Sequence, residues 1–377
     1  MEDHKRPLMK ATNTDKEHYI SIEAPTGLTF TESLKSVTQQ YQATLASHGL
    51  SDNTEIAVRY YPSDITNQSN ELRRIINKIH TGCFISVIGQ PPASGAKLTL
   101  VAYHVAGDKI EKTSSNNGAL HVKHGEYTSL WHAARPDNPG PSDTQTDQIF
   151  NSLNSSLAEC NANLKNNSVR TWIYVRDVDN NYQGMVDSRI AFFNNEGLTR
   201  ATHYISSTGI EGCGETVSDL VFMDSLSISG MAPEQRTFLT AEDYLCPTHD
   251  YNVTFERGTT IRFGDRSHHY ISGTASIDRE GNVLYLGDVA RQTKRTLENI
   301  QALLQSGGSD LDELKNITVY LRDVGDYPRV KEIVESALPD DVAAIYVRGA
   351  VCRPQWLVEI EGIAISPFGN PDFSPFA

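Results

Sequence analysis

The sequence has little cysteine, and its cysteines lie far apart. The five are Cys83, Cys160, Cys213, Cys246 and Cys352, and no two of them form a CxxC pair. Zinc sites and redox dithiols use that close spacing, so the pattern argues against both. An odd number of dispersed thiols is typical of a reducing compartment, and we expect a cytoplasmic protein.

Segments that would direct the chain to a membrane are also lacking. The sequence has no run of about 18 apolar residues, which is the length needed to cross a bilayer. Residues 1–18 are rich in Lys, Asp, Glu and His and have no apolar centre of the kind that a secretion signal needs. We therefore predict no membrane partner.

Positive charge is scarce, since 33 Lys and Arg residues face 47 Asp and Glu residues and leave a net charge of -14. A protein that binds nucleic acid broadly needs a basic surface, so we predict no nucleic-acid partner. An anionic ligand would need local arginines. His132 and the pair His268–His269 have no clustered partners, and we expect neither a metal nor another cofactor.

One pattern occurs three times along the 377 residues. In the C-terminal copy, Gln292-Thr293 opens a helix that carries Leu297, Ile300 and Leu304 on one face, and a strand then runs into Arg322-Asp323. The central copy repeats Gln-Thr at Gln145-Thr146, the apolar spacing, and the strand-terminal pair at Arg176-Asp177. A more diverged copy places Leu34, Val37, Tyr41 and Leu45 on its first helix.

These repeats predict an α+β protein of three units. We assign residues 1–106 to a diverged N-terminal unit, 107–143 to a connecting segment, 144–230 to a central unit and 231–377 to a C-terminal unit. The connecting segment is rich in Asn, Gly and Pro, which is typical of loops.

The C-terminal unit resembles the RidA/YjgF family. Residues 273–304, 316–330 and 357–364 carry the resemblance, which covers about a hundred residues. Members of that family are small single-unit proteins that form homotrimers with ligand clefts between neighbouring subunits. The resemblance therefore implies a pseudo-trimer within one chain, monomeric in solution, in which each unit is a β-sheet with helices packed on one face.

A second resemblance is to the chorismatases, longer relatives of that family. Residues 351–362 (VCRPQWLVEIEG) are similar to the chorismatase motif in which a cysteine and a catalytic glutamate stand seven positions apart, here Cys352 and Glu359. Residues 170–174 (RTWIY) and 206–210 (SSTGI) look like the central motifs of the family. The chain departs at Met185-Val186, where Phe-Asn is expected, and this puts the identity of the substrate in doubt.

The chorismatase resemblance implies a cofactor-free removal of pyruvate from chorismate, a small dianion. Glu359 would protonate the enolpyruvyl methylene carbon, a role that needs a desolvated carboxyl group with a raised pKa. Cys352 resembles the branch that yields 3-hydroxybenzoate rather than a dihydroxycyclohexadiene carboxylate. The substrate would be bound by arginines and hydroxyl groups in the matching segments: Arg348, Arg353, Arg189, Arg170, Tyr182 and Thr208.

The register of the copies predicts one working cleft. The position of Glu359 falls on Phe222 in the central copy and on an aliphatic residue near Leu100 in the N-terminal copy. Only the C-terminal unit keeps the acid, and we expect its cleft to be shared with the central unit.

Other interpretations stay open. Glu359 and Glu361 could both lie on a solvated strand face, and Cys352 could be a small buried hydrophobe. The chain could be an imine or enamine deaminase of the RidA type, although Ile345 falls where that chemistry needs an arginine and Arg348 would have to replace it. It could also be a ligand-binding pseudo-trimer without catalytic activity.

Overall fold

The computed structural model describes residues 7–14, 16–107, 110–115, 118–248 and 253–377. Parts of all three predicted units and of the connecting segment, namely residues 1–6, 15, 108–109, 116–117 and 249–252, lie outside the described residues.

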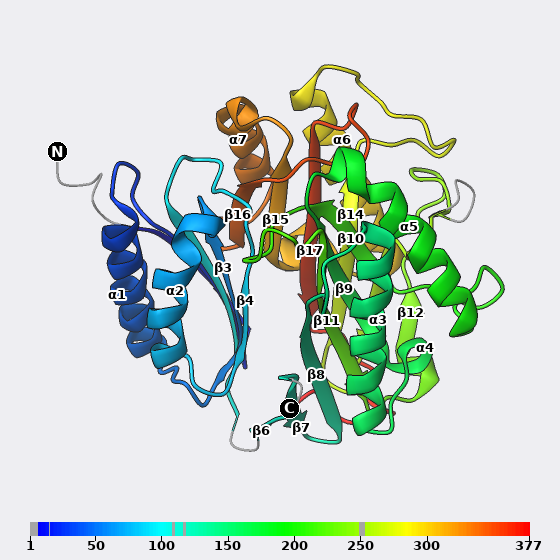
Figure 1. Cartoon of the computed structure of the whole chain (residues 1–377). Helices are drawn as coiled ribbons and strands as arrows, with labels where there is room; N and C mark the ends of the chain where they lie inside the picture. The colour runs from blue at the N-terminus through cyan, green and yellow to red at the C-terminus, as the bar shows by residue number, and fades with distance from the viewer. Residues whose placement is uncertain (1–6, 15, 108–109, 116–117, 249–252) are drawn as a thin grey trace.

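The N-terminal unit is a mixed five-stranded sheet covered by two helices (Figure 1). Helix α1 starts where Thr29 and Glu32 cap each other's backbone, and it ends at Gly49, whose φ of 64° favours glycine. The sheet order is β1-β2-β5-β3-β4. The elements are β1 (Leu8–Asn13), β2 (Glu17–Glu23), α1 (Phe30–His48), β3 (Glu55–Pro62), α2 (Ile65–Ile79), β4 (Phe84–Val87) and β5 (Leu98–Val105).

The central unit has a six-stranded sheet in the order β10-β9-β11-β8-β7-β6. Its elements are β6 (Ile110–Ser114), β7 (Leu120–His124), β8 (Tyr127–Ala134), α3 (Ser142–Glu159), α4 (Leu164–Asn167), β9 (Ser168–Val175), α5 (Val178–Asn195), β10 (Ser206–Glu211) and β11 (Val221–Ser229).

The prediction that residues 107–143 form a separate connecting segment is wrong, because three strands of the central sheet lie within this range. Strand β8 alternates weakly because it is buried on both faces, between helix α3 and the neighbouring sheets, and so it lacks the two-residue period of a half-exposed strand.

The C-terminal unit repeats this arrangement with the order β12-β13-β14-β17-β15-β16. Its elements are a 3₁₀ turn at Pro233–Gln235, β12 (Arg236–Phe238), β13 (Gly258–Arg262), β14 (Ser267–Ala275), α6 (Val289–Ser306), a 3₁₀ turn at Leu311–Glu313, β15 (Leu314–Leu321), a 3₁₀ turn at Val324–Asp326, α7 (Tyr327–Ala337), β16 (Ala343–Arg348) and β17 (Val358–Ser366).

The glutamine of the repeated Gln-Thr pair makes the same kind of hydrogen bond in two units. Gln145 accepts hydrogen bonds from the backbone N–H groups of Leu220 (2.7 Å) and Val221, where β11 begins. Gln292 accepts one from the N–H of Leu357 (2.9 Å), just before β17. The glutamine thus satisfies backbone groups at the start of the inner strand and ties the first helix to it.

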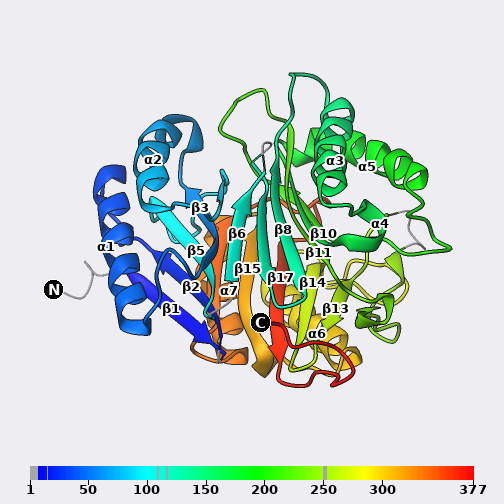
Figure 2. The same cartoon turned by 90° about the horizontal axis from the view of Figure 1, so that it is seen from below.

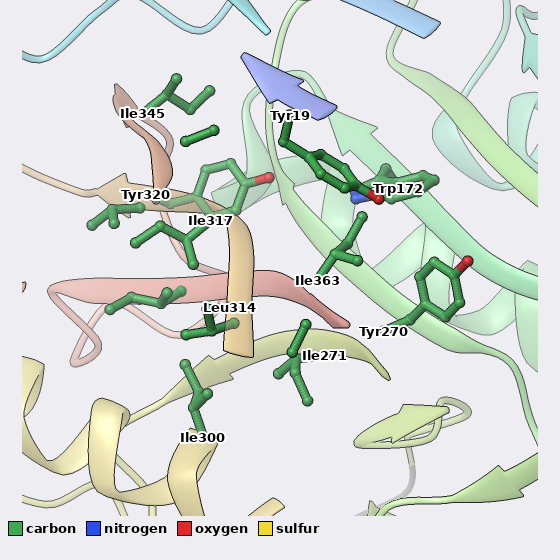
Figure 3. Close-up of a cluster of buried hydrophobic side chains, with 14 of the residues drawn as sticks. Tyr19, Trp172, Tyr270, Ile271, Ile300, Leu314, Ile317, Tyr320, Ile345 and Ile363 are labelled. Carbon is green, nitrogen blue, oxygen red and sulfur yellow. The ribbon is translucent and has the colours of Figure 1, made fainter. Parts of the chain in front are cut away.

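The three sheets face one another around a shared core, with the helices outside (Figure 2). Figure 3 shows Tyr19 of the N-terminal unit, Trp172 of the central unit and Tyr270 of the C-terminal unit close together in this core. Two further apolar clusters lie between a sheet and its own helices, in the N-terminal and the central unit. Burial of each large side chain contributes roughly 1.5–3 kcal/mol, so the part of this core that the three units share stabilises their association.

Buried ion pairs fix which units are neighbours. A carboxylate without water must be paired, so each of these contacts specifies its interface. The pairs are Glu17 with Arg266 (3.0 Å), Asp224 with Arg59 (2.9 Å) and Glu361 with Arg170 (2.6 Å).

Candidate active site

A cavity of about 230 Å³ lies between the central and the C-terminal unit. It is smaller than the usual range for drug-sized ligands, about 300–1,000 Å³, and so suits a compact molecule. The central unit contributes residues from α5 and β10, and the C-terminal unit contributes residues from β14, β17 and the segment before β17. The lining residues are Tyr182, Gln183, Arg189, Ser207, Thr208, Gly209, Val253, Phe255, Arg257, Gly273, Ala275, Ile277, Cys352, Arg353, Trp356 and Glu359.

Glu359 lies on β17 and reaches the cavity past an irregularity in the neighbouring strand. The pairing of β14 with β17 shifts register between Ile271 and Thr274, which is a β-bulge at Gly273. A Cβ atom on Gly273 would lie 2.2 Å from Oε1 of Glu359. Glycine at this bulge therefore makes the room that the carboxyl group occupies.

Glu359 is held in an environment that favours its protonated form. Its exposed fraction is 6%, and burial raises the pKa of its carboxyl group to about 8. The neighbouring charge of Glu361 raises this pKa further, while Arg170 and Arg257 oppose the shift. No hydrogen bond to the carboxyl group of Glu359 is found among the described residues. A buried carboxyl group that is protonated at neutral pH can act as a general acid.

Glu361 points the same way as Glu359 but is fully engaged. Its carboxylate accepts hydrogen bonds from Arg170 (2.6 Å), from the hydroxyl of Tyr320 (2.9 Å) and from the hydroxyl of Thr208. Hydrogen bonds from arginine to a carboxylate are among the stronger ones in proteins. The two glutamates, two positions apart on one strand face, therefore have different environments: the Glu361 side chain has three donors, and the Glu359 side chain has none among the described residues.

Cys352 and Tyr182 lie beside this acid. Burial raises the pKa of the Cys352 thiol to about 12, and the nearby charge of Glu359 adds to the shift. Burial also raises the pKa of Tyr182, whose hydroxyl hydrogen-bonds with Cys352. The thiol is thus neutral at pH 7, which excludes a reactive thiolate and leaves it the role of a small polarisable wall.

Arg189 supplies a cation from the inner side of α5. It is 2% exposed, and its Nε donates to the hydroxyl of Thr254 (3.0 Å). Its Nη2 has no hydrogen-bond partner among the described residues, although the side chain lines the cavity. An unpartnered guanidinium nitrogen that is this deeply buried is a ready partner for an anionic ligand.

The structure brings together most of the predicted site residues. Glu359, Cys352, Tyr182, Arg189, Thr208 and Arg353 all line the cavity. Arg353 is half-buried, with its guanidinium 4.8 Å from the ring centre of Trp356. Met185 and Val186, the departure from the family pattern, are buried in the core beneath α5 and do not line the cavity.

Two predicted residues lie elsewhere. Arg170 does not line the cavity, and its guanidinium pairs with the carboxylate of Glu361. Arg348 lies in a separate surface hollow near Arg176, where it approaches Glu211 (3.7 Å). Its strand, β16, continues the sheet edge without a bulge and ends at Arg348, so the side chain points away from the cavity. The alternative in which Glu359 and Glu361 face solvent is wrong, because each is only 6% exposed.

Sequence reasoning missed Arg257, Phe255 and Gly273. Arg257 is buried at the cavity, and its Nη2 donates to the carbonyl of Cys246 (3.1 Å). It precedes β13 in a stretch that has no counterpart in the repeat, so the alignment of copies carried no signal for it. Gly273 lies within the matched segment, but only its closeness to Glu359 shows its importance.

Among the described residues, one group could hold a metal ion, and it lies outside this cavity. It consists of Glu55, His80 and Cys83 of the N-terminal unit. No helix in the described part of the chain is long and apolar enough to cross a membrane.

Comparison with known proteins identifies the C-terminal unit and the overall fold. The profile of the Endoribonuclease L-PSP family matches residues 261–366. The 3-aminoacrylate deaminase RutC of Acinetobacter baylyi is 32% identical over 96 residues, which is 25% of this chain and 76% of that protein. A 3-hydroxybenzoate synthase of Streptomyces hygroscopicus is 36% identical over 105 residues, but these span 26% of this chain and only 31% of that enzyme. The crystal structure of a chorismatase matches 83% of this chain and 93% of its own, with a TM-score of 0.64 and 18% identity.

Proposed function

Since this chain belongs to the RutC family, which the sequence analysis identified as RidA/YjgF, and its three units share the fold of a chorismatase, we propose that it removes pyruvate from chorismate. The observation that carries the proposal is Glu359, a buried carboxyl group facing a compact cavity that also holds arginines. The similarity of the C-terminal unit to a 3-hydroxybenzoate synthase supports the same substrate.

The reaction requires a proton on the methylene carbon of the enolpyruvyl ether. Glu359 would donate it, because burial keeps its carboxyl group protonated near neutral pH. The cation that forms at the ether carbon weakens the bond from the ether oxygen to the ring, and pyruvate leaves as the neighbouring ring hydroxyl bonds to the vacated ring carbon. The proton that this hydroxyl gives up would restore Glu359. The bond from that oxygen to its original carbon then opens, and the carbon that now carries the oxygen loses its hydrogen as the ring becomes aromatic, which leaves a phenol at the new position.

The substrate's two carboxylates need two cationic partners, and the cavity offers Arg189 and Arg257 on opposite units. Arg189 supports this role because its Nη2 lacks a partner among the described residues. Tyr182 and Thr208 would add hydroxyl groups, and Arg353 lies where it could bind the substrate. In this proposal Arg348 and Arg170 do not contact the substrate.

We propose 3-hydroxybenzoate as the product, because Cys352 lines the cavity beside Glu359. Chorismate and the pair 3-hydroxybenzoate plus pyruvate contain the same atoms, so no water is consumed. The alternative product, a dihydroxycyclohexadiene carboxylate, needs one water molecule. A neutral thiol with weak hydrogen-bonding capacity disfavours ordered water near the reacting ring.

The protein would act as a single chain, since both halves of the cavity come from units of one polypeptide. All five cysteines are free thiols, which supports a reducing, cytoplasmic setting.

The experiment measures pyruvate release from chorismate by the purified protein, with the aromatic product identified by chromatography. We expect turnover by the wild type and a loss of at least about 100-fold in Glu359→Gln, the range typical for a general acid. Glu23→Gln is the matched control, because Glu23 is a half-buried glutamate in the hollow between the C-terminal and N-terminal units and should leave turnover unchanged.

A wild-type protein that releases no pyruvate would refute the chorismatase proposal. Activity on 3-aminoacrylate would then favour a deaminase, the reaction named for the RutC relative. That alternative lacks an arginine at the expected position, because Ile345 stands there and Arg348 lies outside the cavity.

A further inference from the structure

The N-terminal unit contains a buried polar cluster far from the cavity. Glu55, the first residue of β3, is 1% exposed, and His80, which follows α2, is 4% exposed. Nδ1 of His80 lies 2.9 Å from both carboxylate oxygens of Glu55. One ligand atom each of Glu55, His80 and Cys83 lie within 4.8 Å of one another. Three side chains with different ligating atoms thus converge on one point.

The local backbone presents two of these ligands together. His80 and Cys83 are separated by Thr81 and Gly82, and Gly82 has a φ of 87°, which lets the chain turn sharply between them. A spacing of two residues is a common one for paired metal ligands. Glu55 comes from a different element, and the pairing of β3 with β5 fixes it opposite His104.

A second layer of side chains holds the ligands in place. Nε2 of His80 contacts the hydroxyl of Tyr60 at 2.7 Å, which leaves Nδ1 directed at Glu55. The hydroxyl of Tyr41 donates to Oε1 of Glu55 and contacts Nε2 of His104 at 2.7 Å. Metal-bound histidines and carboxylates are usually oriented by such outer contacts.

The charge of the ligand set also suits a divalent cation. A divalent ion bound by one carboxylate, one thiolate and one neutral imidazole would form a site with no net charge, which a low-dielectric interior tolerates best.

We propose that Glu55, His80 and Cys83 bind a zinc ion, with water in the fourth position. Mixed nitrogen, sulfur and oxygen ligands suit zinc, whose bonds of about 2.0–2.3 Å require only small movements from the present arrangement. Cys83 is half-buried, so the ion has a path from solvent. Binding releases the thiol proton of Cys83 and replaces the hydrogen bonds of that thiol and of His80 with bonds to the metal.

The site would stabilise the N-terminal unit, because it links α2 and the turn before β4 to β3. None of its three ligands lines the cavity of the proposed active site, so this proposal is independent of the reaction.

Titration of the metal-free full-length protein with Co²⁺ tests the proposal, since a cobalt–thiolate bond gives a charge-transfer absorption band. We expect the band to saturate at one ion per chain, to be displaced by Zn²⁺, and to be absent in Cys83→Ser. Cys160→Ser is the matched control, because Cys160 is also half-buried and lies in the central unit. Absence of the band in the wild type, or its persistence in Cys83→Ser, would overturn the proposal.

A second measurement avoids dependence on the folding of the variant. In the wild type, Zn²⁺ should slow alkylation of Cys83 by at least about tenfold while leaving Cys160 unchanged, as read by peptide mass spectrometry. It should also raise the Tm by several degrees, since an ion that binds only the folded state stabilises it. Equal alkylation of Cys83 with and without zinc would show that the cluster is a hydrogen-bonded core and no metal site.

Discussion

The cavity between the central and C-terminal units and the two equivalent places in the molecule share a backbone frame but differ in what fills them. In each unit, a tyrosine of the central strand pairs with the position of Glu359: Tyr320 with Glu359, Tyr174 with Phe222, and Tyr61 with Thr99. Only the first of these positions carries an acid beside an open cavity. The comparison teaches that side-chain volume, and not strand geometry, decides which interface can bind a ligand.

Between the N-terminal and central units, the space is occupied by protein. The guanidinium of Arg135 lies 4.5 Å from the ring centre of Phe222 and donates to the hydroxyl of Ser86 (3.2 Å). Phe222 is fully buried and stacks on Tyr174, with ring centres 4.9 Å apart. An aromatic ring and an arginine thus take the volume that substrate would need.

Between the C-terminal and N-terminal units, a hollow remains, but it holds only about 20 Å³. The hydroxyl of Thr99 donates to Glu23 (3.2 Å), and Lys10 of strand β1 pairs with Glu335 (3.1 Å) across the opening. Strand β1 therefore covers the position that is open in the cavity between the central and C-terminal units.

The largest effect is expected from a substitution that leaves a void in the filled interface between the N-terminal and central units. Phe222→Ala should lower the free energy of unfolding by about 3–5 kcal/mol, because it leaves a void in a packed core. Denaturant-induced unfolding measures this loss. Phe368→Ala is the control, since Phe368 is 68% exposed and its truncation should change stability by no more than about 0.5 kcal/mol. A loss below about 1 kcal/mol for Phe222→Ala would mean that the interface is loosely filled.

The pH dependence of stability distinguishes Glu359 from Phe222 without any substrate. In the unfolded chain Glu359 ionises near its ordinary pKa, whereas the folded protein keeps its proton up to about pH 8. The folded state thus binds more protons between these values, and the contribution of Glu359 to stability falls as pH rises from about 4.5 to 8. Glu359→Gln should therefore be more stable than the wild type at pH 8, by a few kcal/mol.

Unfolding curves of Glu359→Gln and the wild type at pH 5 and pH 8 would test this expectation. The two proteins should differ by less than about 1 kcal/mol at pH 5, because this pH lies only slightly above the ordinary pKa at which Glu359 ionises in the unfolded chain. An equal difference at both pH values would contradict a raised pKa.

Gly273→Ala tests whether the carboxyl group of Glu359 needs the space at the β-bulge. The new Cβ would lie 2.2 Å from Oε1 of Glu359, so the carboxyl group must move, and kcat should fall about 10- to 100-fold. Gly140→Ala is the control, because its added Cβ would meet ordinary contacts at 3.7 Å. Wild-type kcat in Gly273→Ala would show that the acid does not depend on this room.

The smallest expected effect concerns Glu361. Glu361→Gln removes the charge of this side chain. The substitution should lower the pKa of Glu359, because a neighbouring negative charge opposes ionisation. Activity that requires the protonated acid should then be lost at a pH lower by roughly one unit. The pH profile of kcat/KM measures the shift. An unchanged alkaline limb would assign the raised pKa to burial alone.

The sequence was sufficient for the repeat and for the pairing of Cys352 with Glu359, because both depend on local spacing. It also predicted that the central unit shares the cleft, since Tyr182, Arg189 and Thr208 lie in the matching central motifs. The structure places these residues on one cavity although more than 140 positions separate Thr208 from Cys352.

The remaining features depend on contacts that spacing does not encode. Arg170 and Arg189 look alike in the sequence. Arg170 pairs with Glu361, whereas Arg189 lines the cavity and its Nη2 has no hydrogen-bond partner within the described part of the chain. Within 107–143, strand β8 has no clear alternation because it is buried on both faces. The Glu55 cluster combines the first residue of β3 with two residues of the connection between α2 and β4, and nothing in the repeat marks them.

The cavity is formed by two units of one polypeptide, and this has a consequence for concentration. An interface between separate subunits comes apart when the protein is diluted far enough, whereas a linked pair experiences a constant effective concentration. Specific activity should therefore stay constant down to the lowest enzyme concentrations that an assay can follow.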